Sequence, residues 1–149
     1  MLYLAYGSNM NSHQMTDERC KSARFIGTGY LQGYEFVFDG SNLKGSKVAD
    51  IRVCQGGIVP YVLWEVNSQE DLNELNKSEG YPKHYTTIEI TVNIDGNNVL
   101  ATAYVMTDYK KSLHSSSISP EYIEKICSGL VEHDLPTLYL DNAIKKASV

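Results

Sequence analysis

The hydrophobic and polar residues of this chain alternate over short stretches, which is the period of β-strands that bury one face. The first stretch covers residues 2–6 and ends at a Gly-Ser turn. Further strands, separated by Gly-containing turns, are predicted at residues 24–30, 34–38, 48–53 and 58–66. Asp95-Gly96 is a typical hairpin turn, so the residues on its two sides, 85–94 and 99–107, are predicted to pair as a β-hairpin.

Helices are predicted where a capping residue precedes apolar residues at helical spacing. Four are expected: from Asn11 or Ser12 to near Cys20, from the S-x-x-D capping box at Ser68 to the Glu79-Gly80 junction, from Ser119-Pro120 onward, and from Pro136 onward. Residues 108–118 are predicted to form a polar loop, and the polar segments 42–47 and 112–119 are expected to be mobile.

Strands outnumber helices in this pattern, and no alternation of strand and helix is visible. The predicted fold class is therefore α+β, with a mostly antiparallel, barrel-like sheet and a few flanking helices. A chain of 149 residues is long enough to bury one core, so residues 1–149 are expected to form a single domain.

Charge and composition narrow the range of partners. The net charge of −5 is spread over the chain without a stripe of Lys and Arg, which argues against a nucleic-acid partner. The N-terminus lacks the basic region of a signal peptide, and no apolar stretch is long enough to cross a bilayer, so no membrane partner is expected. Small neutral or zwitterionic molecules remain as candidate partners.

Cysteine and histidine usage indicates neither disulfides nor a metal site. The three cysteines, Cys20, Cys54 and Cys127, are odd in number and far apart, which is typical of reduced thiols in a cytosolic protein. The four histidines have no metal-ligand spacing. Cys54 also lacks any recognisable nucleophile motif.

The turn Tyr6-Gly7-Ser8-Asn9 is the first candidate for chemistry. It joins a predicted strand to a predicted helix, where free backbone N–H groups suit a carboxylate or an oxyanion. The alternative is an ordinary connection in which the glycine only supplies an unusual backbone conformation.

Glu79 is the second candidate, because it lies between a helix end and a turn and is followed by Tyr81 and Tyr85. Removal of such a carboxyl from water would raise its pKa and suit it to proton transfer near neutral pH. The alternative is a solvated glutamate at the end of a helix. Of the eleven tyrosines, those at the ends of predicted elements could line a pocket: Tyr3, Tyr6, Tyr85, Tyr104 and Tyr122.

Taken together, these segments resemble the γ-glutamylcyclotransferase family, including its AIG2-like branch. The resemblance is collinear and covers nearly the whole chain. Its motifs are Tyr3-Leu4-Ala5-Tyr6-Gly7-Ser8-Asn9-Met10, Arg19-Cys20-Lys21-Ser22-Ala23, Leu31-Gln32-Gly33-Tyr34, Val62-Leu63-Trp64-Glu65-Val66, Leu75-Asn76-Lys77-Ser78-Glu79-Gly80, the strand at Tyr85, Tyr104-Val105-Met106 and Ser119-Pro120-Glu121-Tyr122.

The resemblance implies a six-stranded or similar barrel-like α+β fold and a cyclising transferase or lyase that releases 5-oxoproline without a cofactor. It assigns Glu79 as the catalytic acid/base. The substrate would be bound by Tyr3, Leu4, Ala5, Tyr6, Gly7, Ser8, Asn9 and Tyr122, to which we add Tyr85.

The sequence departs from the family pattern at Asn76, at Pro60-Tyr61 and at Tyr81-Pro82. Glu79 is retained, so these changes bear on the leaving group rather than on the proton transfer. Three functions stay open: cyclisation of γ-glutamyl amino acids or peptides, cyclisation of γ-glutamyl amines, and a non-catalytic small-ligand or interaction module on the same fold. The sequence also leaves open whether the chain forms a homodimer.

Overall fold

The computed structural model describes residues 1–148. Its five-stranded sheet has the order β2-β3-β1-β5-β4, with bounds β1 (Leu2–Ala5), β2 (Arg24–Asp39), β3 (Val48–Glu65), β4 (Tyr85–Ile94) and β5 (Asn97–Met106). Neighbouring strands are antiparallel except for β1 and β5, which pair in parallel at Tyr3 and Thr102. The predicted α+β class and the mostly antiparallel sheet are confirmed.

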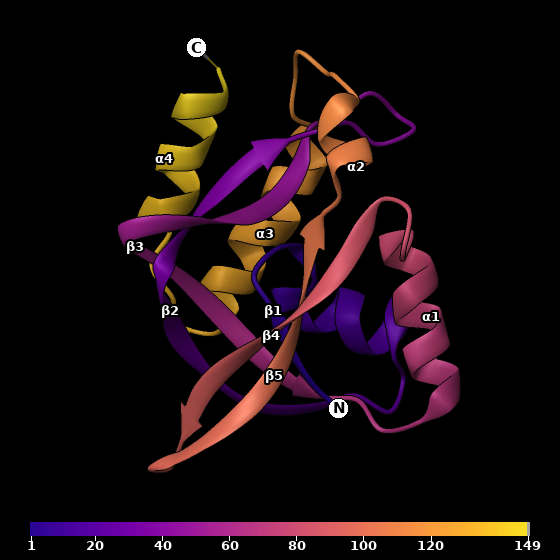
Figure 1. Ribbon diagram of the computed structural model, residues 1–149, viewed down its shortest axis with the longest axis vertical. Coiled ribbons are helices and arrows are strands. Elements are labelled where there is room, and N and C mark those ends of the chain that lie inside the picture. The colour runs from indigo at the N-terminus through magenta and orange to yellow at the C-terminus, as the bar shows by residue number, and fades with distance from the viewer. Residues whose placement is uncertain (149) are drawn as a thin grey trace.

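The sheet is open rather than closed into a barrel. Its two edges are β2 and β4, because β2 packs against helix α4 (Leu138–Ala147) instead of pairing with β4. In Figure 1, α4 lies on the side of the β2–β3 hairpin, and α1 (Gln69–Glu79) lies at the opposite side of the molecule. The short strand β1 is central, so the loop that follows it is surrounded by the rest of the fold.

Two long strands replace the four that the sequence predicts between residues 24 and 66. The predicted breaks are irregularities in one continuous antiparallel ladder, with register shifts between Phe25 and Gly27 and between Gln32 and Tyr34. Gly33 takes a positive φ of 84° at the second shift. A bulge bends a strand without ending its pairing, and this is why the glycines do not separate the strands.

The capping signals locate most of the helices. Ser68 accepts the Asp71 N–H at 3.0 Å at the start of α1, and Gly80 ends that helix with a φ of 68°. Ser119 accepts the Tyr122 N–H at 3.3 Å at the start of α3 (Pro120–Glu132). The last predicted helix, α4, begins at Leu138, shortly after Pro136.

The first predicted helix is irregular, and one helix was not predicted. A 3₁₀ turn η1 (Ser8–Met10) precedes a π-helix η2 (His13–Arg19), whose Gln14 N–H is capped by the Asn11 side chain at 3.1 Å. The helix α2 (Asp108–Ser112) lies within the segment predicted as a loop. Thr107 caps the Lys110 N–H with its side chain at 3.2 Å, and its carbonyl accepts the Lys111 N–H at 3.1 Å.

The two polar segments at 42–47 and 112–119 hydrogen-bond to each other. The Lys47 N–H donates to the Ser117 carbonyl at 2.8 Å, and the Ser119 N–H donates to the Ser46 hydroxyl at 2.8 Å. Within residues 1–148, no helix combines the length and the apolar character that crossing a membrane requires. All three cysteines are free.

Trp64 is among the largest fully buried side chains and connects the core to the loop after β1. Its indole N–H donates to the Asn9 carbonyl at 2.9 Å. On the other side of this loop, α3 approaches so closely that a Cβ added at Gly129 would lie 2.8 Å from the Asn11 backbone nitrogen. The loop is therefore fixed between the sheet and α3.

Trp64→Phe is expected to lower the free energy of unfolding by about 2–4 kcal/mol. The change leaves the buried Asn9 carbonyl without its donor and opens a cavity where the larger ring stood. Urea denaturation measures the loss, with Tyr30→Phe at a half-exposed position as the control. A loss below about 0.5 kcal/mol would show that this contact does not hold the loop.

Candidate active site

A cavity of about 60 Å³ lies where β1, the loop after it and the end of α1 meet, with room for several water molecules. Its lining consists of Tyr3, Leu4, Tyr6, Gly7, Ser8, Asn9, Ala49, Glu79, Tyr85, Tyr104 and Tyr122. The structure thus brings all of the predicted site residues together except Ala5, which is buried in β1 and does not line the cavity.

Two lining residues, Ala49 and Tyr104, are absent from the predicted site. The sequence does indicate Tyr104 as a residue that could line a pocket, because it is one of the tyrosines at the end of a predicted strand. Parallel pairing of β5 with β1 brings its ring to 5.8 Å from the ring of Tyr3, edge to face. The role of Ala49 could not be predicted from its side chain, because only its backbone N–H and carbonyl bind the other residues of the cavity.

The loop after β1 forms a tight turn with free donors. The Met10 N–H donates to the Gly7 carbonyl at 3.1 Å, and the Asn11 N–H donates to the Ser8 carbonyl at 3.0 Å. Within residues 1–148, no acceptor pairs with the backbone N–H of Gly7 or of Ser8. Free N–H groups that line a cavity can bind a carboxylate or an oxyanion.

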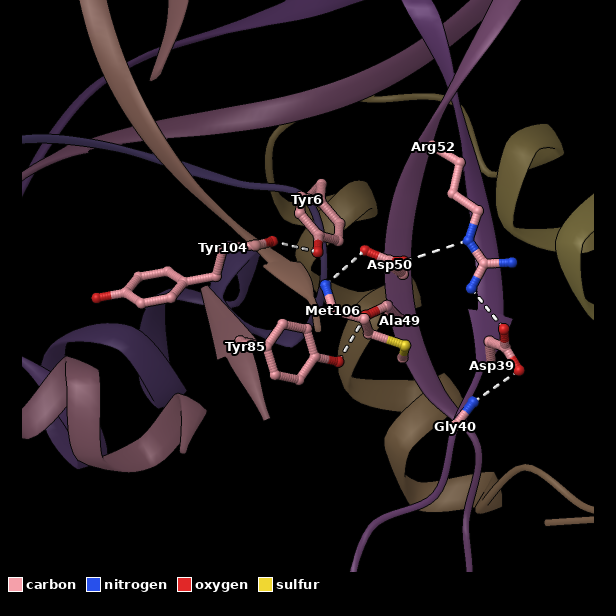
Figure 2. A network of polar contacts seen from close by, with 9 residues as sticks. All are labelled: Tyr6, Asp39, Gly40, Ala49, Asp50, Arg52, Tyr85, Tyr104 and Met106. Atoms are coloured by element: carbon pink, nitrogen blue, oxygen red, sulfur yellow. Dashed lines mark hydrogen bonds and ion pairs between the residues drawn. The ribbon is translucent and has the colours of Figure 1, made fainter. Parts of the chain in front are cut away.

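The backbone of Ala49 binds two tyrosines of the cavity. The Tyr85 hydroxyl donates to the Ala49 carbonyl at 2.7 Å (Figure 2), and the Ala49 N–H donates to the Tyr122 oxygen at 3.0 Å. Because Tyr122 accepts there, its own proton is free for another acceptor. One position of β3 therefore orients side chains from both β4 and α3.

A charged network next to Ala49 joins β3 to the end of β5 (Figure 2). The buried Asp50 accepts the Met106 N–H at 3.0 Å and the Arg52 Nε–H at 3.3 Å. Arg52 also donates to Asp39 at 2.5 Å. Burial alone would raise the pKa of Asp39, but hydrogen bonds from Arg52 and Gly40 lower it. The network fixes β5, and the Tyr6 hydroxyl is held by the Tyr104 carbonyl of that strand at 2.6 Å.

Glu79 is the carboxylic acid of this cavity, and it is partly buried. Burial raises its pKa from the ordinary 4.5 to about 7, against the opposing effects of the Arg19 and Lys110 charges and of hydrogen bonding by Tyr3. Its place at the C-terminal end of α1 also disfavours a negative charge. A carboxyl with a pKa near 7 can both accept and donate a proton at neutral pH.

The tyrosines around Glu79 remain neutral. Burial raises the pKa of each of Tyr3, Tyr6, Tyr85, Tyr104 and Tyr122, and the Glu79 charge raises it further. Their hydroxyls therefore act as hydrogen-bond donors and acceptors rather than as proton acceptors in the reaction.

Of the residues that depart from the family pattern, Asn76 and Tyr81 lie near the cavity residue Tyr104, whereas Pro60 and Tyr61 lie outside the cavity lining. Asn76 is one helical turn before Glu79, outside the lining of the cavity, and its side-chain oxygen accepts the Tyr104 hydroxyl at 2.5 Å. Tyr81 is partly exposed, with its ring 6.4 Å from that of Tyr104. Pro60 and Tyr61 are in β3, outside the lining of the cavity.

A larger hollow of about 280 Å³ lies between the β2–β3 hairpin and α4, but it lacks the chemistry of the first. Its one carboxylate, Glu35, faces Lys146 at 3.4 Å. Within residues 1–148, no group of three or more His, Cys, Asp or Glu side chains could hold a metal ion. The small cavity at Glu79 is therefore the candidate active site.

Comparison with known proteins agrees with this fold. The family model for gamma-glutamyl cyclotransferase, AIG2-like, matches residues 3–123. None of the curated protein sequences matches the chain.

Several solved structures are similar to it, among them two with more than 30% sequence identity. One, from Homo sapiens and described as uncharacterized protein loc79017, is 32% identical over 95% of this chain and 85% of the other, with a TM-score of 0.79. The other, a gamma-glutamyl cyclotransferase, is 31% identical over 96% and 85%, with a TM-score of 0.80. YkqA from Bacillus subtilis, 20% identical over 99% of this chain and 54% of the other, shares the fold with a TM-score of 0.71. The chain belongs to the AIG2-like gamma-glutamyl cyclotransferase family.

Proposed function

We propose that this protein is a γ-glutamylcyclotransferase, which converts a γ-glutamyl amino acid or peptide to 5-oxoproline and releases the amine. The observation that carries the proposal is the meeting, in one cavity, of the Glu79 carboxyl with the free N–H groups of Gly7 and Ser8. Family membership and the similarity to a gamma-glutamyl cyclotransferase support it.

The reaction needs a base, an acid and a site for an oxyanion. The α-amine of the substrate attacks its own γ-carbonyl carbon, a C–N bond forms to close a five-membered ring, and the C–N bond to the leaving amine breaks. The α-ammonium nitrogen loses two protons as it becomes the ring N–H, and the leaving nitrogen gains two as it departs as an ammonium group; Glu79 carries these protons one at a time. Because nucleophile and electrophile are in one molecule, holding the folded conformer supplies much of the catalysis, and no cofactor is required.

The loop and the tyrosines would orient the substrate. The N–H groups of Gly7 and Ser8 are suited to its α-carboxylate or to the developing oxyanion, and the free proton of Tyr122 can serve an adjacent oxygen. The three free cysteines are typical of a reducing compartment, so we place the activity in the cytosol.

The direct test is product analysis. The protein is incubated with matched γ-glutamyl dipeptides and γ-glutamyl amines, and 5-oxoproline is measured by mass spectrometry. Release of 5-oxoproline from dipeptides supports the proposal, and release only from γ-glutamyl amines assigns the protein to those substrates instead. No product from any substrate, while a substrate analogue still binds, would favour the non-catalytic module.

Glu79→Gln is expected to lower kcat by about 10²–10⁴-fold, because the amide keeps the shape of the side chain but cannot carry the proton. Steady-state kinetics measure the loss, and binding of a substrate analogue should change little. Glu74→Gln, at an exposed position of the same helix, is the matched control. Turnover within a few-fold of the wild type would remove Glu79 from the mechanism.

The pH profile of kcat/KM is expected to have an acidic limb near pH 7. Glu79 must be ionised to act as the base, and its pKa is about 7. Below that value kcat/KM should fall about tenfold per pH unit. A limb near the ordinary glutamate value of 4.5 would mean that the carboxyl is not desolvated in the working enzyme.

The pH dependence of the free energy of unfolding should reveal the raised pKa of Glu79 without any substrate. Glu79 has a higher pKa in the folded protein than in the unfolded chain, so between about pH 4.5 and 7 the folded state binds more protons. Stability therefore falls as the pH rises through this window. Urea denaturation at pH 5 and pH 8 should show the wild type losing stability relative to Glu79→Gln, and an equal response of the two proteins would contradict the raised pKa.

A further inference from the structure

Gln14 is a buried amide outside the cavity that contacts two residues of its lining. It belongs to η2 and has 3% of its surface exposed. Its Nε2 donates to the Ser8 hydroxyl oxygen at 2.6 Å and to the Asn9 Oδ1 at 2.8 Å. A side-chain amide nitrogen carries two hydrogens, so both donors of Gln14 are used in these bonds.

The bond to Asn9 determines which way the Asn9 amide faces. Because Oδ1 points to Gln14, Nδ2 points to the opposite side and donates to the Tyr3 hydroxyl oxygen at 3.0 Å. Tyr3 accepts from Asn9, so its own proton is left for another acceptor. Glu79 lines the same cavity as Tyr3, so its carboxyl is the acceptor that the cavity offers to this proton, in agreement with the lowering effect of Tyr3 on the Glu79 pKa.

The hydrogen bond from Gln14 to Ser8 likewise determines where the Ser8 proton points. The Ser8 oxygen accepts a proton from Gln14, so the Ser8 hydroxyl is left to donate elsewhere. Ser8 lines the cavity, and an oxygen of the substrate is the acceptor that the cavity would bring to it.

We propose that Gln14 is a positioning residue that sets the hydrogen-bond directions of this site: one amide turns the Tyr3 proton toward Glu79 and the Ser8 proton toward the substrate. The part that concerns Ser8 rests on the proposed function. The part that concerns Tyr3 and Glu79 can be measured without any substrate.

The other groups that act on Glu79 are two positive charges and five neutral hydroxyls. The positive charges are Arg19 from η2 and Lys110 from α2. The neutral hydroxyls whose pKa responds to the Glu79 charge belong to Tyr3, Tyr6, Tyr85, Tyr104 and Tyr122. A neutral substitution at position 14 adds no charge to this set, so a change in Glu79 titration would come through the hydrogen bonds.

The test is a ¹³C NMR titration of the Glu79 carboxyl in Gln14→Met, which removes both hydrogen bonds without adding charge. Asn9 is then free to turn over, and Tyr3 can donate to the Asn9 Oδ1 instead of to Glu79. We expect the pKa of Glu79 to rise by about one to two units, the value of a hydrogen bond to a charged group. Gln69→Met, at an exposed position of α1, is the matched control and should leave the pKa unchanged.

A double-mutant cycle separates positioning from a general loss of structure. If Gln14 acts through Tyr3, then Gln14→Met should have little further effect on the Glu79 pKa in a Tyr3→Phe background. Equal effects in the two backgrounds, or no change in the Glu79 pKa of folded Gln14→Met, would overturn the proposal. Should Gln14→Met fail to fold, Gln14→Leu gives the same comparison, because leucine is also neutral and lacks both donors.

Activity supplies an independent readout. In a protein that turns over a γ-glutamyl substrate, Gln14→Met should shift the acidic limb of kcat/KM to higher pH by the same amount as the NMR pKa and raise KM through Ser8. A limb that stays in place would contradict the proposal. A wild type without turnover would refute the proposed function, while the NMR cycle would still decide the role of Gln14.

Discussion

The position of the Glu79 carboxyl away from bulk water is the constraint on which the candidate site depends. Burial favours the neutral acid, and without compensation the group would be of no use as a base. Three elements supply the compensation: Arg19 from η2, Lys110 from α2 and the Tyr3 hydroxyl from β1. The pKa of about 7 is the result of this balance, so each of these elements must pack correctly around the end of α1.

The packing that brings these elements together relies on hydrogen bonds to the main chain. Trp64 binds the Asn9 carbonyl, Tyr6 binds the Tyr104 carbonyl, and Tyr85 binds the Ala49 carbonyl. Each contact joins segments that are far apart in the sequence. A buried carbonyl that has such a partner costs little, whereas one that loses it destabilises the fold. The site and the core of this protein therefore share the same stabilising contacts.

The parts of the fold that could be predicted are those set by neighbouring residues, such as helix caps and turns. The limits of α1 follow from Ser68 and Gly80, whose roles depend only on neighbouring residues, and the β4–β5 hairpin follows from its Asp-Gly turn. The resemblance, rather than any local pattern, suggested that Glu79 and the loop after β1 belong to one site.

What the sequence did not show depends on distant partners. The helix α2 is polar along its length, and the Thr107 side chain that caps it is held by a distant acceptor, the Lys83 carbonyl, at 2.6 Å. The long strands β2 and β3 continue through their glycines because each has the other to pair with. Ala49 contributes only backbone groups, and Gln14 matters because of two acceptors that the π-helix brings within reach.

The attachment of Tyr85 and Tyr122 to the Ala49 backbone has a consequence for how such a site can diverge. Every residue except proline offers the same N–H and carbonyl, so these two contacts do not depend on which side chain of fitting size is at position 49. The contact between Asn76 and Tyr104 is different, because it joins two side chains and changes when either is replaced. Substitutions at position 76 or 104 can therefore alter this rim of the cavity while the backbone contacts that orient Tyr85 and Tyr122 are kept.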